Sequence, residues 1–339
     1  MDKKIDSKPD STAEQLSTST VTFLIPVYNA EDTLAASLAS ALAQTRPADE
    51  IVIIDDGSRD GSAAVIAAVR DPRIRAFSQA NQGLAATLNR GIALATSQYI
   101  ARLDNDDLAL PKRLERQLEF MEANPRVALL GTWSQIYVGE TPSDRFHRHP
   151  TESNSLKLEL LFDNPFVHSS VMYRTDIVRA LGEYRVERQT RIPEDYEFWS
   201  RIARVHEVAN LPEVHTIYRE MPNSMTRVSA DEILDNVIAI STDNLQHVLP
   251  HASHETCKSL SRLYHGRSDT AGSRMGLEAL RLWRQAALAI GGPARQWTPE
   301  FRTRYRRAQR RLLIQVLRRS LPVPAANLLR SARRIFRPN

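Results

Sequence analysis

Short apolar runs alternate with segments of helical periodicity along the first third of the chain. Between two such runs, Leu34, Leu38 and Leu42 recur every four positions, which is the spacing of one face of a helix. Strands that alternate with helices in this way favour a largely parallel sheet. The pattern therefore predicts an α/β fold, with strands over residues 21–27, 51–54, 74–78 and 99–103.

The middle of the chain continues with fewer, longer elements. Pro111 suits the first turn of a helix, and Asn124-Pro125 ends that helix. We expect strands over 127–138 and 166–173, with a loop containing Pro and His between them, and a helix over about 194–203.

After about Asp231 the pattern becomes helical and increasingly basic, with a break at Gly291-Gly292-Pro293. The first twenty residues carry charge, Ser and Thr, and no apolar stretch resembling a signal peptide. The predicted organisation is a disordered leader over 1–20, an α/β domain over 21–230 with halves 21–107 and 108–230, and a helical, arginine-rich extension over 231–339.

Three polar clusters follow three of the apolar runs at the points where the predicted strands end. Ligands of open α/β sheets bind at the carboxyl ends of the strands, so the three clusters are expected to meet in one crevice. Taken singly, each cluster is equally compatible with ordinary turn chemistry. The clusters are Pro26-Val27-Tyr28-Asn29, Asp55-Asp56-Gly57-Ser58 and Asp104-Asn105-Asp106-Asp107.

The third cluster is predicted to hold a metal ion. Asp104, Asp106 and Asp107 place three carboxylates within four residues, and such crowding is costly unless a cation or solvent neutralises it. Oxygen ligands suit Mg²⁺ or Mn²⁺, which share substrate phosphates rather than filling an all-protein cage. Extended spacing would place Arg102 on the same side as Asp104 and Asp106. The alternative is a solvated acidic turn.

Charge is distributed unevenly along the chain. The stretch 295–339 holds thirteen arginines and one acid, Glu300, which leaves 32 Lys and Arg against 39 Asp and Glu elsewhere. Cys257 is the only cysteine, which favours a reducing compartment, and no run of about eighteen apolar residues predicts a membrane-spanning helix. We therefore expect a cytoplasmic protein.

A helix expected over 299–320 combines arginines with an apolar stripe of Tyr305, Ala308, Leu312, Leu313, Val316 and Leu317. This composition is typical of a helix that lies on an anionic membrane surface, so we expect peripheral contact with the inner face of the plasma membrane. The alternative is a helix packed on the core by that stripe. Nucleic acid is not expected as a partner, because few aromatic residues accompany the arginines and the body is acidic.

The motifs, taken together and in order, resemble family 2 glycosyltransferases of the GT-A fold. The matching stretches extend from Val21 to about Trp199, and a weaker match follows in NLPEVHTIYRE. They are VTFLIPVYNA, EIVIIDDGSRDGS, NQGLAATLNRGIALATSQYIARLDNDD, FVHSSVMYR and IPEDYEFW.

The resemblance implies a nucleotide-sugar donor held in the first half of the domain. By this resemblance the segment Pro26, Val27, Tyr28 and Asn29 contacts the nucleotide, and the ring of Tyr28 stacks on the base. Asp56, next to Asp55, binds the base. Asn81 and Gly83 lie near the donor. Asp106 would ligate Mn²⁺ or Mg²⁺, and Asp104, beside Asn105, would contact ribose or a metal-bound water.

The second half would then receive the acceptor, a glycan or a lipid-linked hydroxyl. The resemblance implies that Asp195 is the catalytic base of an inverting transfer, with Glu194 as the second candidate. His168 lies where members of the family approach the acceptor, although a lone His beside a strand is more often a structural hydrogen-bond donor. Trp199 and Phe198 are expected in the core, and the pairs His147/His149 and His251/His254 are expected on the surface.

Two positions depart from the family pattern. Leu88, followed by Asn89, stands where an arginine is common, so Arg90 or Arg102 would have to face the diphosphate. Met221 stands where a histidine often follows Tyr218-Arg219-Glu220.

Two other functions remain as alternatives: a nucleotide-sugar-binding protein without catalysis, and a sugar nucleotidyltransferase. The second would be expected to carry a Gly-rich, basic phosphate loop after the first strand, where this chain has the cluster that begins at Pro26.

Overall fold

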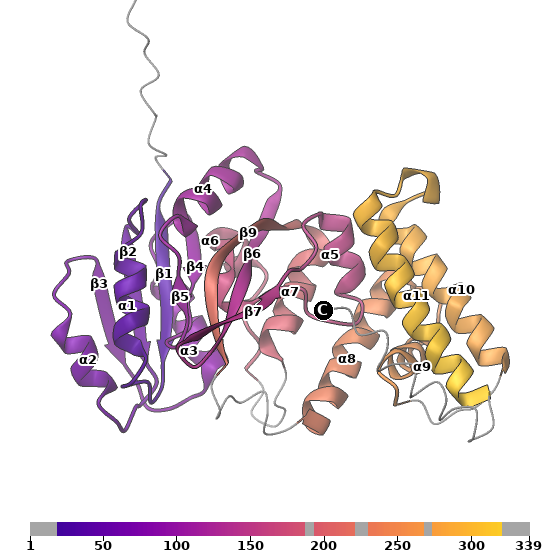
Figure 1. Ribbon diagram of the computed structural model, residues 1–339, viewed down its shortest axis with the longest axis horizontal. Helices are drawn as coiled ribbons and strands as arrows, with labels where there is room; N and C mark the ends of the chain where they lie inside the picture. Colours follow the sequence, from indigo (N-terminus) through magenta and orange to yellow (C-terminus); the bar gives the residue numbers. More distant parts are fainter. Residues whose placement is uncertain (1–18, 187–192, 221–229, 268–272, 321–339) are drawn as a thin grey trace, which may run out of the picture.

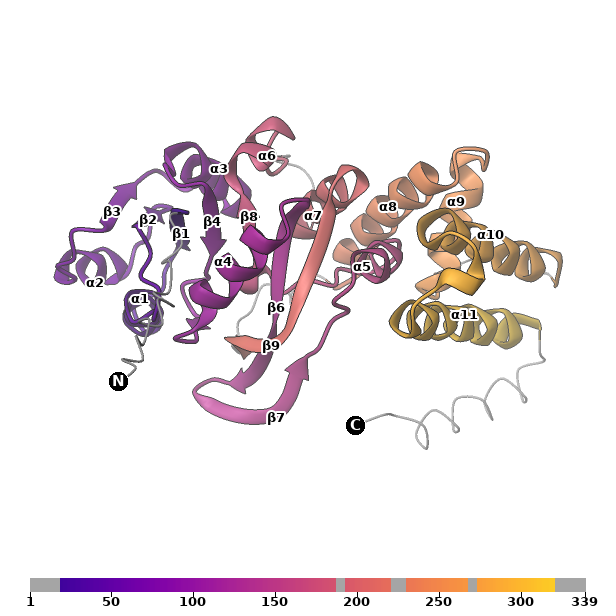
Figure 2. The same cartoon turned by 90° about the horizontal axis from the view of Figure 1, so that it is seen from above.

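A computed structural model describes residues 19–186, 193–220, 230–267 and 273–320. The predicted leader lies largely outside these residues, as do Met221 and the chain after Ser320. One sheet crosses the molecule in the strand order β3-β2-β1-β4-β8-β6-β9-β5, and β7 pairs with β6 (Figures 1 and 2). The predicted α/β fold is therefore confirmed.

The first half of the sheet is parallel. β2 and β4 flank β1, and β3 pairs with β2. Three helices connect these four strands, as the alternation of apolar runs predicted. The elements are β1 (Val21–Val27), α1 (Leu34–Leu42), β2 (Glu50–Asp55), α2 (Ser62–Ala68), β3 (Ile74–Ser78), α3 (Leu84–Leu94) and β4 (Tyr99–Arg102).

The second half of the sheet is mixed. β8 pairs antiparallel with β4 and with β6, whereas β6 and β9 run parallel over their whole length. The elements are β5 (Leu108–Ala109), α4 (Arg113–Ala123), β6 (Val127–Val138), β7 (Thr141–His147), α5 (Ser153–Glu159), β8 (Met172–Arg174), α6 (Thr175–Ala180), α7 (Glu194–Val205) and β9 (Glu207–Glu220).

Two expectations for this half were wrong. The predicted strand over 166–173 is mostly not a strand, because residues His168–Ser170 form a 3-10 turn in which Ser170 N donates to Val167 O at 2.8 Å. The predicted loop between 138 and 166 contains β7 and α5. β7 escaped prediction because it is an edge strand with mostly exposed polar residues, so it lacks an apolar run.

Alternate residues of β1 enter the cores on the two faces of the sheet. Phe23 and Ile25 pack with α1 and α4 on one face, and Leu24 packs with α3, α6 and α7 on the other. Helix α3 lies very close to β1, because a Cβ added at Gly91 would stand 2.1 Å from Leu24 Cδ1. This packing holds the carboxyl ends of the strands in fixed positions.

The remaining helices gather beyond β9, at the end of the molecule opposite β3 (Figures 1 and 2). They form a third core with α5, built around Trp283, Phe301 and Leu312. In the described part of the chain no helix is long and apolar enough to cross a bilayer. The helices are α8 (Ala230–Val248), α9 (His254–Tyr264), α10 (Ser273–Gly291) and α11 (Pro299–Ser320).

Candidate active site

The three polar clusters meet at the carboxyl edge of the parallel strands and are bonded to one another. Asn105 Nδ2 donates to Pro26 O at 3.2 Å, which joins the third cluster to the first. Asn29 N donates to Ser58 Oγ at 3.0 Å, and Arg59 N donates to Asn29 Oδ1 at 2.8 Å, which join the first cluster to the second. The sequence-predicted crevice is thus a single network of loops.

Asp56 organises the loop that leads into α3. Its carboxylate accepts from Gln79 Nε2 at 2.7 Å, from Gln82 N at 2.9 Å and from Gly83 N at 2.8 Å. Asn81 Nδ2 donates to the backbone oxygen of Asp56 at 3.0 Å. A carboxylate offers about four acceptor sites, so Asp56 retains capacity for one further donor such as a base N–H.

Tyr28 and Asp55 occupy different positions in this crevice. The ring of Tyr28 is 48% exposed at the end of β1, so its face is open to a flat ligand. Asp55 is buried and accepts from Ser58 N at 3.0 Å, which shapes the turn after β2. Asn29 adopts a left-handed conformation with φ 47°, which orients Tyr28 and the loop together.

The acidic turn after β4 brings three carboxylates together. Oxygens of Asp104, Asp106 and Asp107 lie within 4.8 Å of one another, and within the described residues no other such group of acids, His or Cys occurs. Arg102, whose side chain is 1% exposed, makes a bidentate ion pair with Asp104. Asp107 Oδ1 accepts from the backbone N–H of Arg219 at 2.8 Å, so it joins the turn to β9 rather than capping it.

The charges of this turn favour a cation. Burial and the Asp104 carboxylate raise the pKa of Asp106 to about 6, and burial raises the pKa of Asp107 well above its usual range. Asp107 Oδ2 is buried and has no hydrogen-bond partner within the part of the chain that the structure describes. A group of carboxylates with an unpartnered oxygen and raised pKa values fits a divalent metal that prefers oxygen ligands.

Two buried arginines offset part of the negative charge. Beneath the turn, Arg113 Nη2 donates to Arg102 O at 2.7 Å and to Val171 O at 3.1 Å. Burial and the neighbouring Arg102 guanidinium lower the pKa of Arg113 to about 9. Arg113 therefore holds the backbone of β4 directly before the acidic turn and that of Val171 directly before β8.

The second pair of acids begins helix α7. Asp195 Oδ2 accepts from Asn164 Nδ2 at 2.8 Å, and the half-buried carboxylates of Glu194 and Asp195 lie at a helix N-terminus, which favours negative charge. Burial and the charge of Asp195 raise the pKa of Glu194 to about 7. Burial also raises the pKa of Asp195, although the hydrogen bond from Tyr196 N, the charge of Arg102 and the Asn164 amide oppose that change.

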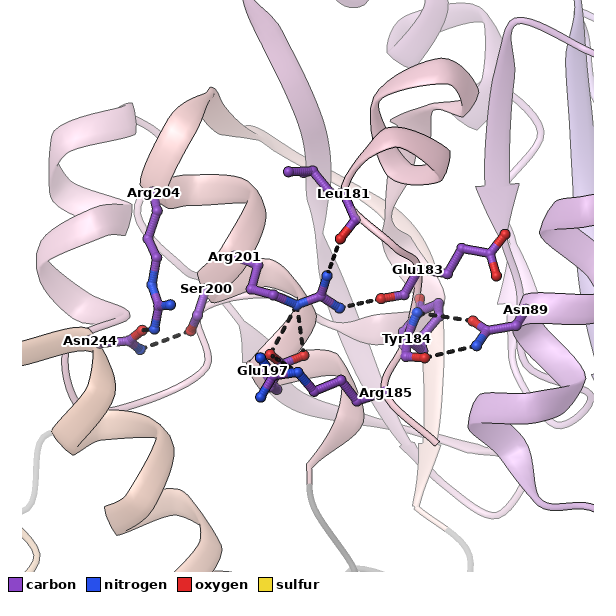
Figure 3. A network of polar contacts seen from close by, with 10 residues as sticks. All are labelled: Asn89, Leu181, Glu183, Tyr184, Arg185, Glu197, Ser200, Arg201, Arg204 and Asn244. Atoms are coloured by element: carbon purple, nitrogen blue, oxygen red, sulfur yellow. Dashed lines mark hydrogen bonds and ion pairs between the residues drawn. The ribbon is translucent and has the colours of Figure 1, made fainter. Parts of the chain in front are cut away.

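Helix α7 is held firmly on both sides (Figure 3). Arg201 pairs with Glu197 at 2.9 Å and donates to Leu181 O at 2.6 Å in the loop after α6. On the opposite side, Asn244 of α8 donates to Ser200 Oγ at 2.8 Å. The position of Glu194 and Asp195 is therefore set by tertiary contacts along the whole helix.

His168 lies in an aromatic cluster beside these acids. Its Nε2 is 3.0 Å from the Tyr184 hydroxyl, and its ring meets Trp199 edge to face. Burial lowers the pKa of His168 well below its usual value, so the imidazole is neutral. Trp199 and Phe198 are fully buried, which confirms the prediction that they belong to the core.

The departure at Leu88 brings no new cation beside the acidic turn. Leu88 is buried, and Asn89 makes two hydrogen bonds with the backbone of Tyr184 (Figure 3). Arg90 donates to Ser78 O at 2.9 Å and lies over the ring of Phe77. Of the two arginines considered, Arg102 is the one beside the acidic turn. Met221 lies outside the described residues.

Sequence reasoning missed several residues that support the site. Ser169 Oγ accepts from Asp104 N at 2.8 Å, and Ser37 Oγ donates to Asp104 O at 2.8 Å. Asn164 carries no local signal, because it meets Asp195 only through the fold. His147 and His149 were expected on the surface, but they are half-buried with stacked rings at 5.8 Å, and burial lowers the pKa of His149 to about 4. His251 and His254 are exposed, as expected.

Known proteins share this sequence pattern and this fold. The chain is 37% identical to the amylovoran biosynthesis glycosyltransferase AmsE of Erwinia amylovora over 197 residues, covering 56% of this chain and 73% of AmsE. It is 33% identical to the putative glycosyltransferase EpsE of Bacillus subtilis over 227 residues, covering 65% and 80% of the two chains.

The solved structure of S. aureus TarS residues 1–349 in complex with UDP-GlcNAc superposes with a TM-score of 0.59. That similarity covers 89% of this chain and 90% of TarS at 14% identity, so it supports the fold. The sequence profile of glycosyl transferase family 2 matches residues 22–182, which include the three clusters and His168. The chain therefore belongs to glycosyl transferase family 2.

Proposed function

We propose that the protein transfers a sugar, with inversion, from a nucleoside-diphosphate sugar to a hydroxyl of a glycan or lipid-linked acceptor. The observation that carries the proposal is that the two acidic groups share one electrostatic environment. Burial raises the pKa values of Asp106 in the acidic turn and of Glu194 and Asp195 on α7, and the charge of the buried Arg102 guanidinium opposes that change at all three. The donor and the acceptor would thus bind on opposite sides of one crevice.

The donor is proposed to lie across the loops after β1, β2 and β4. Tyr28 offers an exposed ring face to the base, and Asp56 offers its remaining acceptor capacity. Asp106, with Asp104, would hold a divalent Mn²⁺ or Mg²⁺ ion, which when bound stabilises negative charge on the leaving diphosphate. A uridine nucleotide is proposed, and the UDP-GlcNAc in the TarS complex supports that choice.

The acceptor hydroxyl is proposed to lose its proton to Asp195. A base for this step must be a carboxylate within hydrogen-bond reach of the acceptor, with a pKa raised toward the working pH. Asp195 has a raised pKa, and Asn164 fixes the direction of its carboxylate. Direct attack of that hydroxyl on the anomeric carbon inverts the configuration, and the nucleoside diphosphate departs from the opposite face.

The biological setting is proposed from the names of relatives. AmsE is named for amylovoran biosynthesis, and the 30% identical ExoO of Rhizobium meliloti is named for succinoglycan biosynthesis. We propose that this protein acts in the assembly of a cell-surface polysaccharide or lipopolysaccharide. The site of action would be the cytoplasm, at the inner face of the plasma membrane.

A panel of nucleotide sugars with Mn²⁺ or Mg²⁺ tests the proposal. Release of nucleoside diphosphate from one donor, lost on chelation, is the expected result. Asp195→Asn should abolish transfer and leave donor affinity nearly unchanged, because Asp195 is assigned to the acceptor side. Donor binding without any turnover would favour the non-catalytic alternative. Formation of a nucleotide sugar from a nucleoside triphosphate and a sugar phosphate would favour a nucleotidyltransferase.

A further inference from the structure

The apolar stripe predicted for α11 is mostly used inside the protein. Ala308 and Leu312 are buried in the third core, and a Cβ added at Gly276 of α10 would meet Val316 at 2.4 Å. Tyr305 stacks on Trp283 of α10 at 5.7 Å. These residues pack α11 on its neighbours, so the expectation that this stripe faces a membrane was wrong for most of its members.

A neighbouring face of α11, which includes Leu313 and Leu317 of the predicted stripe, is open to solvent. Arg302, Arg306, Arg310, Leu313 and Leu317 follow one another at intervals of three or four residues and are all exposed. Leu313 is 39% exposed and Leu317 is 48% exposed, so the face carries both positive charge and apolar surface. We call these five residues the α11 face.

The neighbouring helix extends the apolar end of this face. The contacts of Gly276 with Val316 and of Gly291 with Phe301 set α10 and α11 antiparallel. This register places Leu277, which is 73% exposed, near the turn of α11 that carries Leu313 and Leu317. Three exposed leucines therefore cluster at one end of the pair, and the arginines lie beside them.

Other arginines of α11 serve the fold, which distinguishes them from those of the face. Arg304 pairs with Glu159 of α5 at 3.3 Å, and Arg311 pairs with Asp163 at 3.8 Å. Within the described part of the chain, Arg306 and Arg310 take part in no ion pair. Their charges are therefore available to a partner.

The leucine end of α11 lies on the same side of the molecule as the active-site crevice. In Figure 1, β1 runs downward, so the carboxyl ends of the parallel strands point toward the lower side. Helix α11 also runs downward, and its Ser320 end lies on that side. The leucines therefore lie at the end of the α11 face that is nearest to the side toward which the carboxyl ends of the strands point.

We propose that the α11 face docks the enzyme on an anionic lipid bilayer. The arginines would lie in the headgroup layer, where each basic residue near an anionic leaflet favours binding, and the leucines would enter the boundary of the acyl chains. This inference gives the lipid-linked acceptor of the proposed reaction a physical location. It is independent of catalysis, because binding to vesicles needs no donor.

Sedimentation of the full-length protein with vesicles tests the inference. We expect binding to phosphatidylcholine vesicles containing 30% phosphatidylglycerol, weak binding to phosphatidylcholine alone, and loss of binding at high salt. The triple variant Arg302→Ala, Arg306→Ala, Arg310→Ala should bind about a hundredfold more weakly, at about fivefold for each arginine. Leu313→Ser with Leu317→Ser should weaken binding at all salt concentrations.

Two control variants make the result decisive. The variant Arg70→Ala, Lys112→Ala, Arg126→Ala removes the same charge from exposed positions remote from α11 and should bind as the unaltered protein does. The variant Arg330→Ala, Arg333→Ala, Arg334→Ala removes the same charge from the chain beyond Ser320, so it separates the contribution of those arginines to vesicle binding from that of the α11 face. Full binding by the α11 triple variant, or equal losses in the α11 and remote triple variants, would overturn the inference. Circular dichroism and donor hydrolysis confirm that each variant is folded.

Discussion

Replacing Asn164 by alanine removes the amide that holds the proposed catalytic base. Asn164 Nδ2 donates to Asp195 Oδ2 at 2.8 Å, and Asn164 Oδ1 accepts from Phe166 N at 3.1 Å. The first bond stabilises the carboxylate form of Asp195, because an N–H donor has no comparable interaction with the protonated oxygen. Its loss should therefore raise the pKa of Asp195 further and leave the carboxylate held only at Oδ1, which accepts from Tyr196 N at 2.7 Å.

The size of the effect follows from the type of bond. A hydrogen bond to a charged group contributes about 1.5–3 kcal/mol, and the half-buried position of Asp195 favours the lower end of that range. At a pH well below the pKa of the base, kcat/KM should fall roughly tenfold, since ~1.4 kcal/mol corresponds to a factor of ten. At high pH the deficit should shrink, because Asp195 is then ionised in both proteins.

The assay is the pH dependence of kcat/KM for sugar transfer, with donor affinity measured separately. We expect the acidic limb of the profile to move to higher pH and donor affinity to remain unchanged. Ser241→Ala is the matched control. Ser241 Oγ donates to Leu161 O at 2.7 Å, so this variant also removes one hydrogen bond to the segment that contains Asn164, but it does not affect a bond to Asp195. A uniform loss of activity at every pH, with an unmoved limb, would show that Asn164 acts only on folding.

Three further predictions address the acids and the packing of α3. Glu194→Gln should retain transfer and move the acidic limb to lower pH, because removing a neighbouring negative charge favours the Asp195 carboxylate; loss of turnover would instead make Glu194 the base. Asp106→Asn should reduce Mn²⁺ affinity in calorimetry by more than about tenfold, since even residues that only orient ligands cost that much; unchanged affinity would remove Asp106 from the metal site. Gly91→Ala should lower the free energy of unfolding in urea by about 1–3 kcal/mol, because the added methyl meets Leu24; a gain in stability, as helix propensity alone predicts, would contradict the packing argument.

Local patterns predicted the elements whose periodicity reflects burial. β1, β3 and β6 have the expected bounds, and helix α7 begins at the expected residue, because each combines an apolar pattern with a clear boundary. The turn at His168–Ser170 and the edge strand β7 were missed. The turn interrupts an apolar run through a local hydrogen bond of Ser170 N with Val167 O, and β7 is an exposed edge strand of mostly polar residues, so no apolar pattern marks either of them.

The polar clusters show the same division within the site. The sequence placed three of them after strands, and parallel pairing brings the carboxyl ends of neighbouring strands to one edge, so the crevice could be predicted. The hydrogen-bond partners of the acidic side chains could not be predicted from the sequence. Asp56 is bonded to residues 79–83, Asp107 to Arg219 and Asp195 to Asn164, and these bonds join parts of the chain up to 112 residues apart.

The sequence by itself determined the α/β fold and the family, because strand periodicity and local motifs encode them, and it predicted the residues that would bind a donor. Only the tertiary structure decided which face of α11 is free, which carboxylates are buried and which amide orients Asp195. Burial and side-chain contacts depend on how distant segments pack together. The apolar stripe of α11 is plain in the sequence, but only packing divides it between residues buried in the core and residues left on the solvent face.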